Sequence, residues 1–166
     1  MDTRPHDHSG SDATQAVANL GMARPPLVYG AAMVTGWFLE RGWPLPFLPR
    51  RLVALLGSVL VVVAVVVFSY AIRTFQTAGT PVRGNKPTTV MVRTGPYRFS
   101  RNPIYLAFSL LQLGIASWVN SVWLIATLIA AVALMAAVVI PREERYLERR
   151  FGADYVDDKR SVRRWL

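Results

Sequence analysis

The chain has 166 residues, which allows one domain at most; 52% of them are hydrophobic and only 17% are charged, against about 25% charged residues in soluble globular proteins. The absence of cysteine excludes disulfides, a thiolate nucleophile and cysteine-ligated zinc. The net charge of +9 fits either nucleic acid or an anionic membrane surface as a partner. Uncharged runs of about twenty residues, which soluble nucleic-acid-binding domains do not carry, favour the membrane and argue against nucleic acid.

Residues 1–24 are polar and predict a mobile tail ahead of a single domain over residues 25–166. The basic start and directly following apolar stretch of a secretory signal are missing from this segment. The histidines of the chain, His6 and His8, both lie in this tail among aspartates. Such histidines are most often solvated, so we expect no metal site.

The first apolar stretch follows Pro25-Pro26 and predicts a transmembrane span over about residues 26–46. Its continuous apolar part, residues 27–39, is short for a bilayer, and the sequence up to residue 46 would continue in the membrane interface. Whether this segment crosses completely stays open. Gly30 and Gly36 suit a close helix contact.

The second span, Leu52 to Ile72, is the clearest one because its 21 residues carry no charge. At 1.5 Å per residue it covers about 30 Å, the thickness of the hydrocarbon core. The segment is apolar on every face, which argues against an amphipathic helix of a soluble protein.

The region from Ile104 to Ile140 holds 37 residues without a formal charge. One helix of that length would reach about 55 Å, too far for the membrane, so a break is needed. Asn120-Ser121 is the natural place and gives a helical hairpin of two spans, residues 104–119 and 121–140. Gly114 would let these two helices approach closely.

The distribution of basic residues predicts an orientation. The segment from Arg73 to Arg101 has six and the segment after Pro141 has eight, whereas the first loop has three and the hairpin turn none. Four spans put both ends of the chain and the segment after the second span on one side, which the positive-inside rule makes cytoplasmic. The sequence therefore predicts an all-α, multi-pass protein of the cell (inner) membrane, with about four transmembrane helices.

Two polar segments flank the hairpin. Residues 73–103 are punctuated by glycine and proline and predict an ordered loop, with a short extended piece at Thr88 to Val92 and Asn102 capping a helix that starts at Pro103. Residues 141–166 predict a cytoplasmic amphipathic helical tail that Pro141 kinks or restarts and Gly152 interrupts. Its last arginines, Arg160, Arg163 and Arg164, are expected to form a solvated basic end.

A short hairpin brings both polar segments to one face, where they would form a pocket half inside the membrane. The plainest interpretation of their charges is interface anchoring, with arginines on lipid phosphate. However, Glu143-Glu144 lies where the last helix leaves the bilayer, a costly place for two carboxylates unless cations pair with them. GxGxxG, GxxxxGK[ST] and HExxH are absent, which disfavours a Rossmann-type site and metal catalysis.

Two stretches at this pocket, TGPYRFSRNPIYLA (residues 94–107) and PREERYLERRFGADY (residues 141–155), resemble the isoprenylcysteine carboxyl methyltransferase family and the related phospholipid methyltransferases. TFQTAGT (residues 74–80) and KPTT (residues 86–89) add to the likeness, which covers about the C-terminal two thirds of the chain. The order of the two stretches around a hairpin of this length makes the resemblance specific. It implies an integral membrane methyltransferase with S-adenosylmethionine as methyl donor.

The resemblance also implies roles for individual residues. The expected donor-binding residues are Tyr97, Arg101, Asn102, Pro103, Tyr105, Glu143 and Glu144. The chemistry of methyl transfer, and not the resemblance, adds the expected catalytic residues, which are Arg98, Tyr105, Glu144 and Arg149. The prenylcysteine enzymes have a histidine at the position of Asn102, and this departure argues against a prenylcysteine substrate.

The acceptor is expected to be a lipophilic or amphipathic molecule that enters from the bilayer, with a carboxylate or an amine as nucleophile. A carboxylate would need no base, and Arg98 or Arg149 could orient it; an amine must lose a proton, for which a glutamate or Tyr105 is suited. Two other functions stay open. One is an NADPH-dependent membrane reductase, and the other is a non-enzymatic module whose basic tail binds anionic lipid.

Overall fold

The computed structural model describes residues 25–79 and 92–165, and this part of the chain is helical without strands. Its elements are α2 (Pro25–Gly42), α3 (Arg50–Thr77), the short 3-10 helix η1 (Gly95–Arg98), α4 (Pro103–Val119), α5 (Val122–Leu134), the π-helical turn η2 (Met135–Val139), α6 (Ile140–Phe151) and α7 (Ala153–Ser161). The all-α prediction is confirmed for these residues. The predicted mobile tail and most of the predicted extended piece at 88–92 lie outside them.

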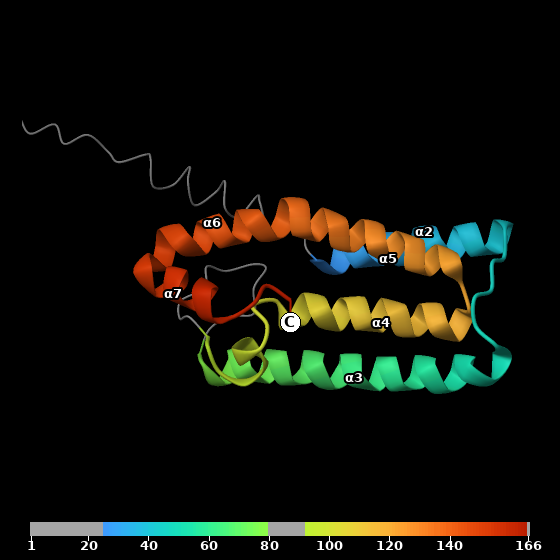
Figure 1. The fold of residues 1–166 in the computed structure, drawn as a ribbon, viewed down its shortest axis with the longest axis horizontal. Coiled ribbons are helices and arrows are strands. Elements are labelled where there is room, and N and C mark those ends of the chain that lie inside the picture. The colour runs from blue at the N-terminus through green and yellow to red at the C-terminus, as the bar shows by residue number, and fades with distance from the viewer. Residues whose placement is uncertain (1–24, 80–91, 166) are drawn as a thin grey trace, which may run out of the picture.

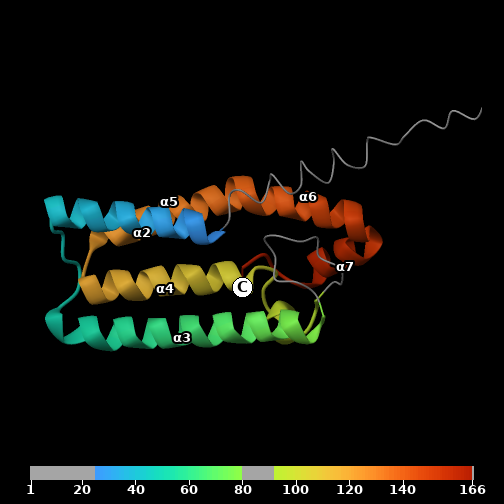
Figure 2. The same ribbon diagram turned by 180° about the vertical axis from the view of Figure 1, so that it is seen from behind.

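The helices form an elongated antiparallel bundle (Figures 1 and 2). α3 packs along α4, and α2 packs along α5, so that the bundle consists of two helix pairs. Between the pairs, Tyr29 of α2 stacks on Phe108 of α4, and Phe108 meets Phe68 of α3 edge to face. These aromatic contacts join three helices near the end where α4 begins.

Within residues 25–79 and 92–165, two stretches are long and apolar enough to cross a membrane: α3, and the continuous helix Val122–Phe151 that α5, η2 and α6 form together. Only 11% of the most apolar 18-residue stretch of α3 is buried in the protein. A core helix of a soluble protein would be mostly covered, whereas the valines and leucines of α3 lie on the surface. This surface is suited to lipid. α2 and α4 are shorter or less apolar, so the four-span arrangement stays a prediction.

The predicted break of the hairpin is confirmed. α4 ends at Val119, Asn120 takes the left-handed conformation with φ 58°, and the Ser121 side chain accepts a hydrogen bond from the Leu124 N–H at the start of α5. Asparagine tolerates this conformation better than most residues. The Asn120 side chain also holds the loop between α2 and α3, because its Oδ1 accepts from the Leu48 N–H at 2.7 Å and its Nδ2 donates to the Leu48 carbonyl.

The glycine contacts differ in part from the prediction. Gly114 was expected to bring the two hairpin helices together, but it faces α3, where an added Cβ would lie 3.0 Å from the Val61 backbone nitrogen and 3.2 Å from the Gly57 carbonyl oxygen. Helical periodicity gives the face of a residue relative to its own helix and leaves open which neighbour covers it. Gly36 does form a close contact, with Leu124 and Thr127 of α5, whereas Gly30 has open space around it.

Pro141 neither stops nor restarts the last long helix. Proline has no N–H and its ring crowds the carbonyl four residues earlier, which an ordinary α-helix does not accommodate without distortion. Here the chain widens into η2 just before it, and the Ile140 N–H donates to the Met135 carbonyl five residues earlier. The helix therefore continues through Pro141 and carries α6 beyond the apolar part of the bundle.

Gly114→Ala is expected to destabilise the bundle, because the new Cβ meets backbone atoms of α3 that cannot move away independently. Overpacking of this kind costs about 1–3 kcal/mol. Gly30→Ala is the matched control, since its Cβ meets nothing within 4 Å and the change favours the helix by about 0.5–1 kcal/mol. Thermal unfolding in detergent should give a lower midpoint for Gly114→Ala alone; equal midpoints would contradict the close α3–α4 packing.

Candidate functional site

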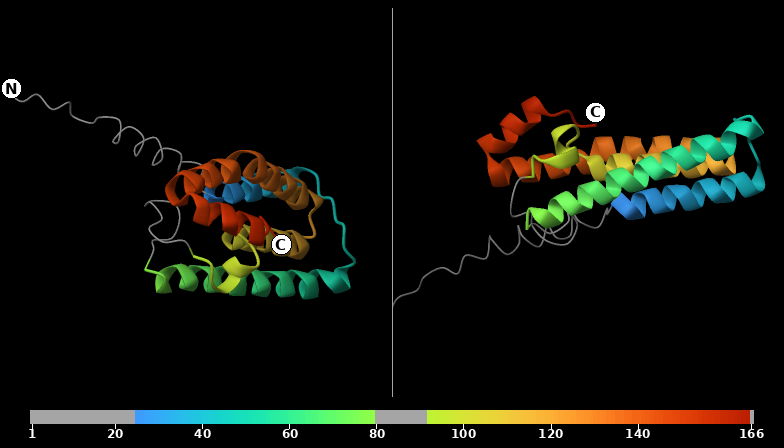
Figure 3. Two further views of the ribbon diagram at one scale, coloured as in Figure 1. Left: turned by 60° about the vertical axis from the view of Figure 1, so that its left-hand side comes forward. Right: turned by 90° about the horizontal axis from the view of Figure 1, so that it is seen from below.

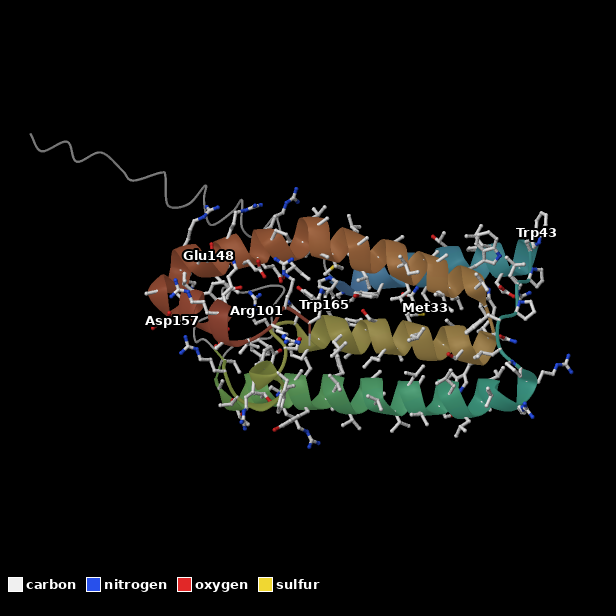
Figure 4. The ribbon with its side chains drawn as sticks, in the orientation of Figure 1. Met33, Trp43, Arg101, Glu148, Asp157 and Trp165 are labelled. Carbon is white, nitrogen blue, oxygen red and sulfur yellow. The ribbon has the colours of Figure 1, made fainter. Side chains whose placement is uncertain are left out.

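The polar residues of interest gather at one end of the bundle. The hairpin returns the chain to this end, so the start of α4 and α6 lie at the same end of the bundle, and α7 folds back from α6 (Figure 3). Arg101, Glu148 and Trp165 lie at this end, whereas Trp43 lies at the opposite end beside the hairpin turn (Figure 4). The predicted convergence of the two polar segments is therefore found.

The loop that leads into α4 is fixed against the end of α3. Gly95 has φ 60°, and a Cβ there would lie 2.6 Å from the Thr74 hydroxyl, so both its backbone conformation and its surroundings require glycine. The buried ring of Tyr97 then meets Phe75 edge to face, with 4.9 Å between ring centroids. This anchoring sets where Arg101 and the first turn of α4 begin.

Glu144 is the centre of the polar cluster and is only 6% exposed. Its Oε1 accepts hydrogen bonds from Arg101 Nη1 and Arg164 Nε, both at 3.0 Å, and its Oε2 accepts from Arg164 Nη2 at 2.8 Å. Lys159 Nζ lies 3.8 Å from Oε2. A buried carboxylate is tolerated only when cations and hydrogen bonds replace the lost water, and these groups supply both.

The surrounding cations are stabilised in turn. The hydrogen bond to Glu144 raises the pKa of Arg164 above its ordinary value, and the hydrogen bond to Glu148 raises the pKa of Lys159. The prediction that Arg164 belongs to a solvated basic end is therefore wrong: the side chain turns back onto Glu144. Arg160 and Arg163 are exposed as expected.

Glu143, the other member of the acidic pair, has a different environment. Its Oε1 accepts a hydrogen bond from the Tyr105 hydroxyl at 2.6 Å. Its Oε2 is buried and has no hydrogen-bond partner among the described residues. Tyr105 is 5% exposed and packs in the apolar cluster with Tyr29, Met135 and Ile140. The hydrogen bond from Tyr105 thus orients the Glu143 carboxylate, whose Oε2 can still accept a hydrogen bond and lies next to the apolar interior.

Asn102 and Pro103 begin α4 as expected, and both are buried. The Asn102 side chain, however, makes no capping hydrogen bond within the helix. Its Nδ2 instead donates to the Arg164 carbonyl at 3.0 Å, and its backbone N–H donates to Ser100 Oγ at 3.2 Å. The amide therefore joins the loop to the C-terminal segment.

Of the other expected site residues, Arg98 ends η1 and is exposed, with its guanidinium over the Phe99 ring. Arg149 is also exposed, near the end of α6. The structure thus gathers Arg101, Asn102, Tyr105, Glu143 and Glu144 around one centre and leaves Arg98 and Arg149 on its surface.

The sequence analysis missed the contributions of Arg164 and Tyr155 to this centre. The Tyr155 hydroxyl lies 3.5 Å from Arg101 Nη1, and the ring is buried. Its spacing of four from Phe151 and of eight from Leu147 predicts a shared stripe that lies on membrane or on protein, although Gly152 breaks the helix within this stripe. Arg164 gave no such signal, because it follows the irregular end of α7 and pairs with a residue 20 positions earlier.

A family model described as phospholipid methyltransferase matches residues 52–154, which is more than half of the chain. The match covers α3, η1, the hairpin and α6, and so includes Arg101, Tyr105 and the acidic pair. Neither the curated proteins nor the solved structures give a match to this chain.

Glu144→Gln is expected to loosen the segment after α7, because a neutral amide cannot replace the charge-assisted bonds to Arg101 and Arg164. Such bonds are worth about 1.5–3 kcal/mol each. Limited trypsin digestion should cut after Arg160 and Arg163 several-fold faster than in the wild type. Glu148→Gln is the control, since it also loses a bond to Lys159 but at a side chain that is 35% exposed; equal acceleration in both variants would contradict the central role of Glu144.

Proposed function

Since the chain belongs to the phospholipid methyltransferase family, we propose that it is an integral membrane methyltransferase that uses S-adenosylmethionine and methylates a lipophilic acceptor at the cytoplasmic membrane face. The observation that carries this proposal is the Tyr105–Glu143 pair. It offers a buried, oriented carboxylate oxygen without a hydrogen-bond partner among the described residues, at the polar end of a lipid-suited bundle.

The residues present fit the proposed donor. S-adenosylmethionine carries an ammonium and ribose hydroxyls that donate hydrogen bonds to a carboxylate acceptor, and a sulfonium that is attracted by its negative charge. Glu143 Oε2 is such an acceptor, and the buried tyrosines beside it suit a flat ring. The bound donor supplies an already activated methyl group. The protein itself has to align the acceptor and exclude water, and alignment alone contributes several kcal/mol.

Charge at the centre favours an amine over a carboxylate as the acceptor. The guanidinium groups of Arg101 and Arg164 are both engaged by Glu144, so they are poorly placed to hold an anionic substrate. The group that still has an oxygen without a hydrogen-bond partner among the described residues is a carboxylate, that of Glu143. An amine must lose its proton before it attacks, and Glu143 can accept that proton while the Tyr105 hydroxyl holds its other oxygen in place.

The surface of the bundle supports entry of the acceptor from lipid. α3 exposes large aliphatic side chains along its length, and the site lies at the end of the same bundle rather than on a separate soluble domain. The predicted cytoplasmic orientation would give the polar donor access from water at this end. The acceptor and the donor would then reach the site from two different phases.

Isothermal titration of the purified protein in detergent with S-adenosylhomocysteine, the demethylated donor, tests the proposal. We expect micromolar binding that Glu143→Gln weakens strongly, because the amide replaces an acceptor oxygen by a donor group. Glu148→Gln should bind like the wild type. Tight binding of NADPH instead would indicate a reductase, and binding of neither molecule would indicate a non-enzymatic membrane module.

The acceptor class has a separate test. Membranes containing the protein should transfer the labelled methyl group of S-adenosylmethionine into lipid extracts, with the label on nitrogen. Glu143→Gln should reduce the transfer by about a hundredfold or more, the usual range for loss of a general base, even at saturating donor. Label released as methanol by mild base would instead identify a methyl ester and therefore a carboxylate acceptor.

A further inference from the structure

Residues Val162–Trp165, which we call the strap, follow α7 with Val162 in an extended conformation and lie along the loop that precedes α4. Three consecutive carbonyl groups of the strap accept hydrogen bonds from this loop. The Val162 carbonyl accepts from Arg101 Nε and the Arg163 carbonyl from the Arg101 N–H, both at 3.0 Å. The Arg164 carbonyl accepts from Asn102 Nδ2, also at 3.0 Å. These hydrogen bonds therefore fix the position of the strap relative to Arg101 and Asn102.

Two side chains secure the strap. Arg164 forms the two-pronged contact with Glu144, with Nε–Oε1 and Nη2–Oε2 distances of 3.0 and 2.8 Å. Trp165 packs on the apolar cluster that contains Tyr105 and Ile140. One strap side chain thus holds Glu144, and the next lies against the cluster that holds the partner of Glu143.

These contacts give the residues at the centre different hydrogen-bonding partners. Arg101 directs its N–H, Nε and Nη1 to the strap and to Glu144, and Asn102 directs its side-chain amide to the strap. These donor groups are engaged within the protein. Glu144 is likewise engaged through both oxygens, whereas the buried Oε2 of Glu143 has no hydrogen-bond partner among the described residues.

We propose that Arg164 is a positioning residue of the methyl-donor site: it neutralises Glu144 and fixes the strap over Arg101 and Asn102, which leaves Glu143 as the carboxylate that meets the ligand. This role rests on the proposed function. The donor site is then assembled from two parts of the chain, the loop before the hairpin and the strap about 60 residues later. Without Arg164, Glu144 would keep Arg101 and the more distant Lys159 as cationic partners but would lose the hydrogen-bond donor to its Oε2, and the two carboxylates would no longer have distinct roles.

Four variants of the full chain test the role of Arg164. Arg164→Gln removes the cation, and Arg164→Lys keeps it but loses the two-pronged geometry. Trp165→Ala loosens the strap and leaves the charge in place. Arg163→Gln is the matched control, because the neighbouring side chain is exposed. For each variant, titration gives the Kd of S-adenosylhomocysteine, and amide hydrogen exchange reports how firmly the strap is held.

We expect Arg164→Gln to raise the Kd about tenfold or more, the effect of losing a charge-assisted hydrogen bond. Arg164→Lys should give an intermediate Kd, and Arg163→Gln should match the wild type. Trp165→Ala should speed exchange in the strap with a smaller rise in Kd than Arg164→Gln. If Arg164→Gln and Trp165→Ala raise the Kd equally for an equal increase in exchange, Arg164 is only an anchor and the proposal is overturned.

The two proposals fail in different ways. If the wild type does not bind S-adenosylhomocysteine, the proposed function is overturned and the positioning role falls with it. If the wild type binds and Arg164→Gln binds equally well, only the positioning role is overturned. If Arg164→Gln fails to fold, the Kd of Arg164→Lys tests the positioning role instead. An intermediate Kd supports the role, and a Kd equal to that of the wild type overturns it.

Discussion

A carboxylate buried between two guanidinium groups organises the polar end of this bundle. Glu144 is supplied by α6, Arg101 by the loop before α4, and Arg164 by the segment after α7, so three distant parts of the chain meet through one charge. The Glu144 carboxylate and the Arg101 guanidinium would be costly to bury alone, and the half-exposed Arg164 completes the hydrogen bonding of the carboxylate. The interaction therefore connects the loop, the hairpin and the C-terminal segment at one point.

At the opposite end of the bundle, an amide and a hydroxyl group serve the same purpose, the hydroxyl through a carboxylate. There Asn120 binds both the N–H and the carbonyl of Leu48, and the Ser121 hydroxyl donates to Glu40 at 2.6 Å. These contacts join the hairpin turn to the end of α2 and to the loop between α2 and α3. Because the hairpin is held at both ends, its length sets how far α6 extends, and hence the height at which the acidic pair meets the loop.

The features that follow local rules were predictable from the sequence. Asn120 and Gly152 sit where the backbone needs a positive φ, and both breaks occur as expected. The meeting of Arg101 with the acidic pair followed from the length of an uncharged hairpin. The partners of Gly114 and Arg164 were not predictable, because they depend on which helix covers a given face and on how an irregular segment folds back. The assignment of Glu144 to the cations and of Glu143 to Tyr105 also required three-dimensional coordinates.

That assignment depends on the five-residue turn before Pro141. The turn contains one residue more than an α-helical turn, and each residue of an α-helix advances the chain by about 100°. If Met135 to Val139 were wound as ordinary α-helix, all later side chains would rotate by one position, and Glu143 would take the place between the guanidinium groups that Glu144 now fills. Conversely, a deletion of one residue within the turn would restore a regular helix and leave the phase of α6 unchanged. A homologous chain without the wide turn should therefore be one residue shorter between the hairpin break and the acidic pair. In a sequence comparison this single-residue gap would look like an alignment error, whereas the structure explains it.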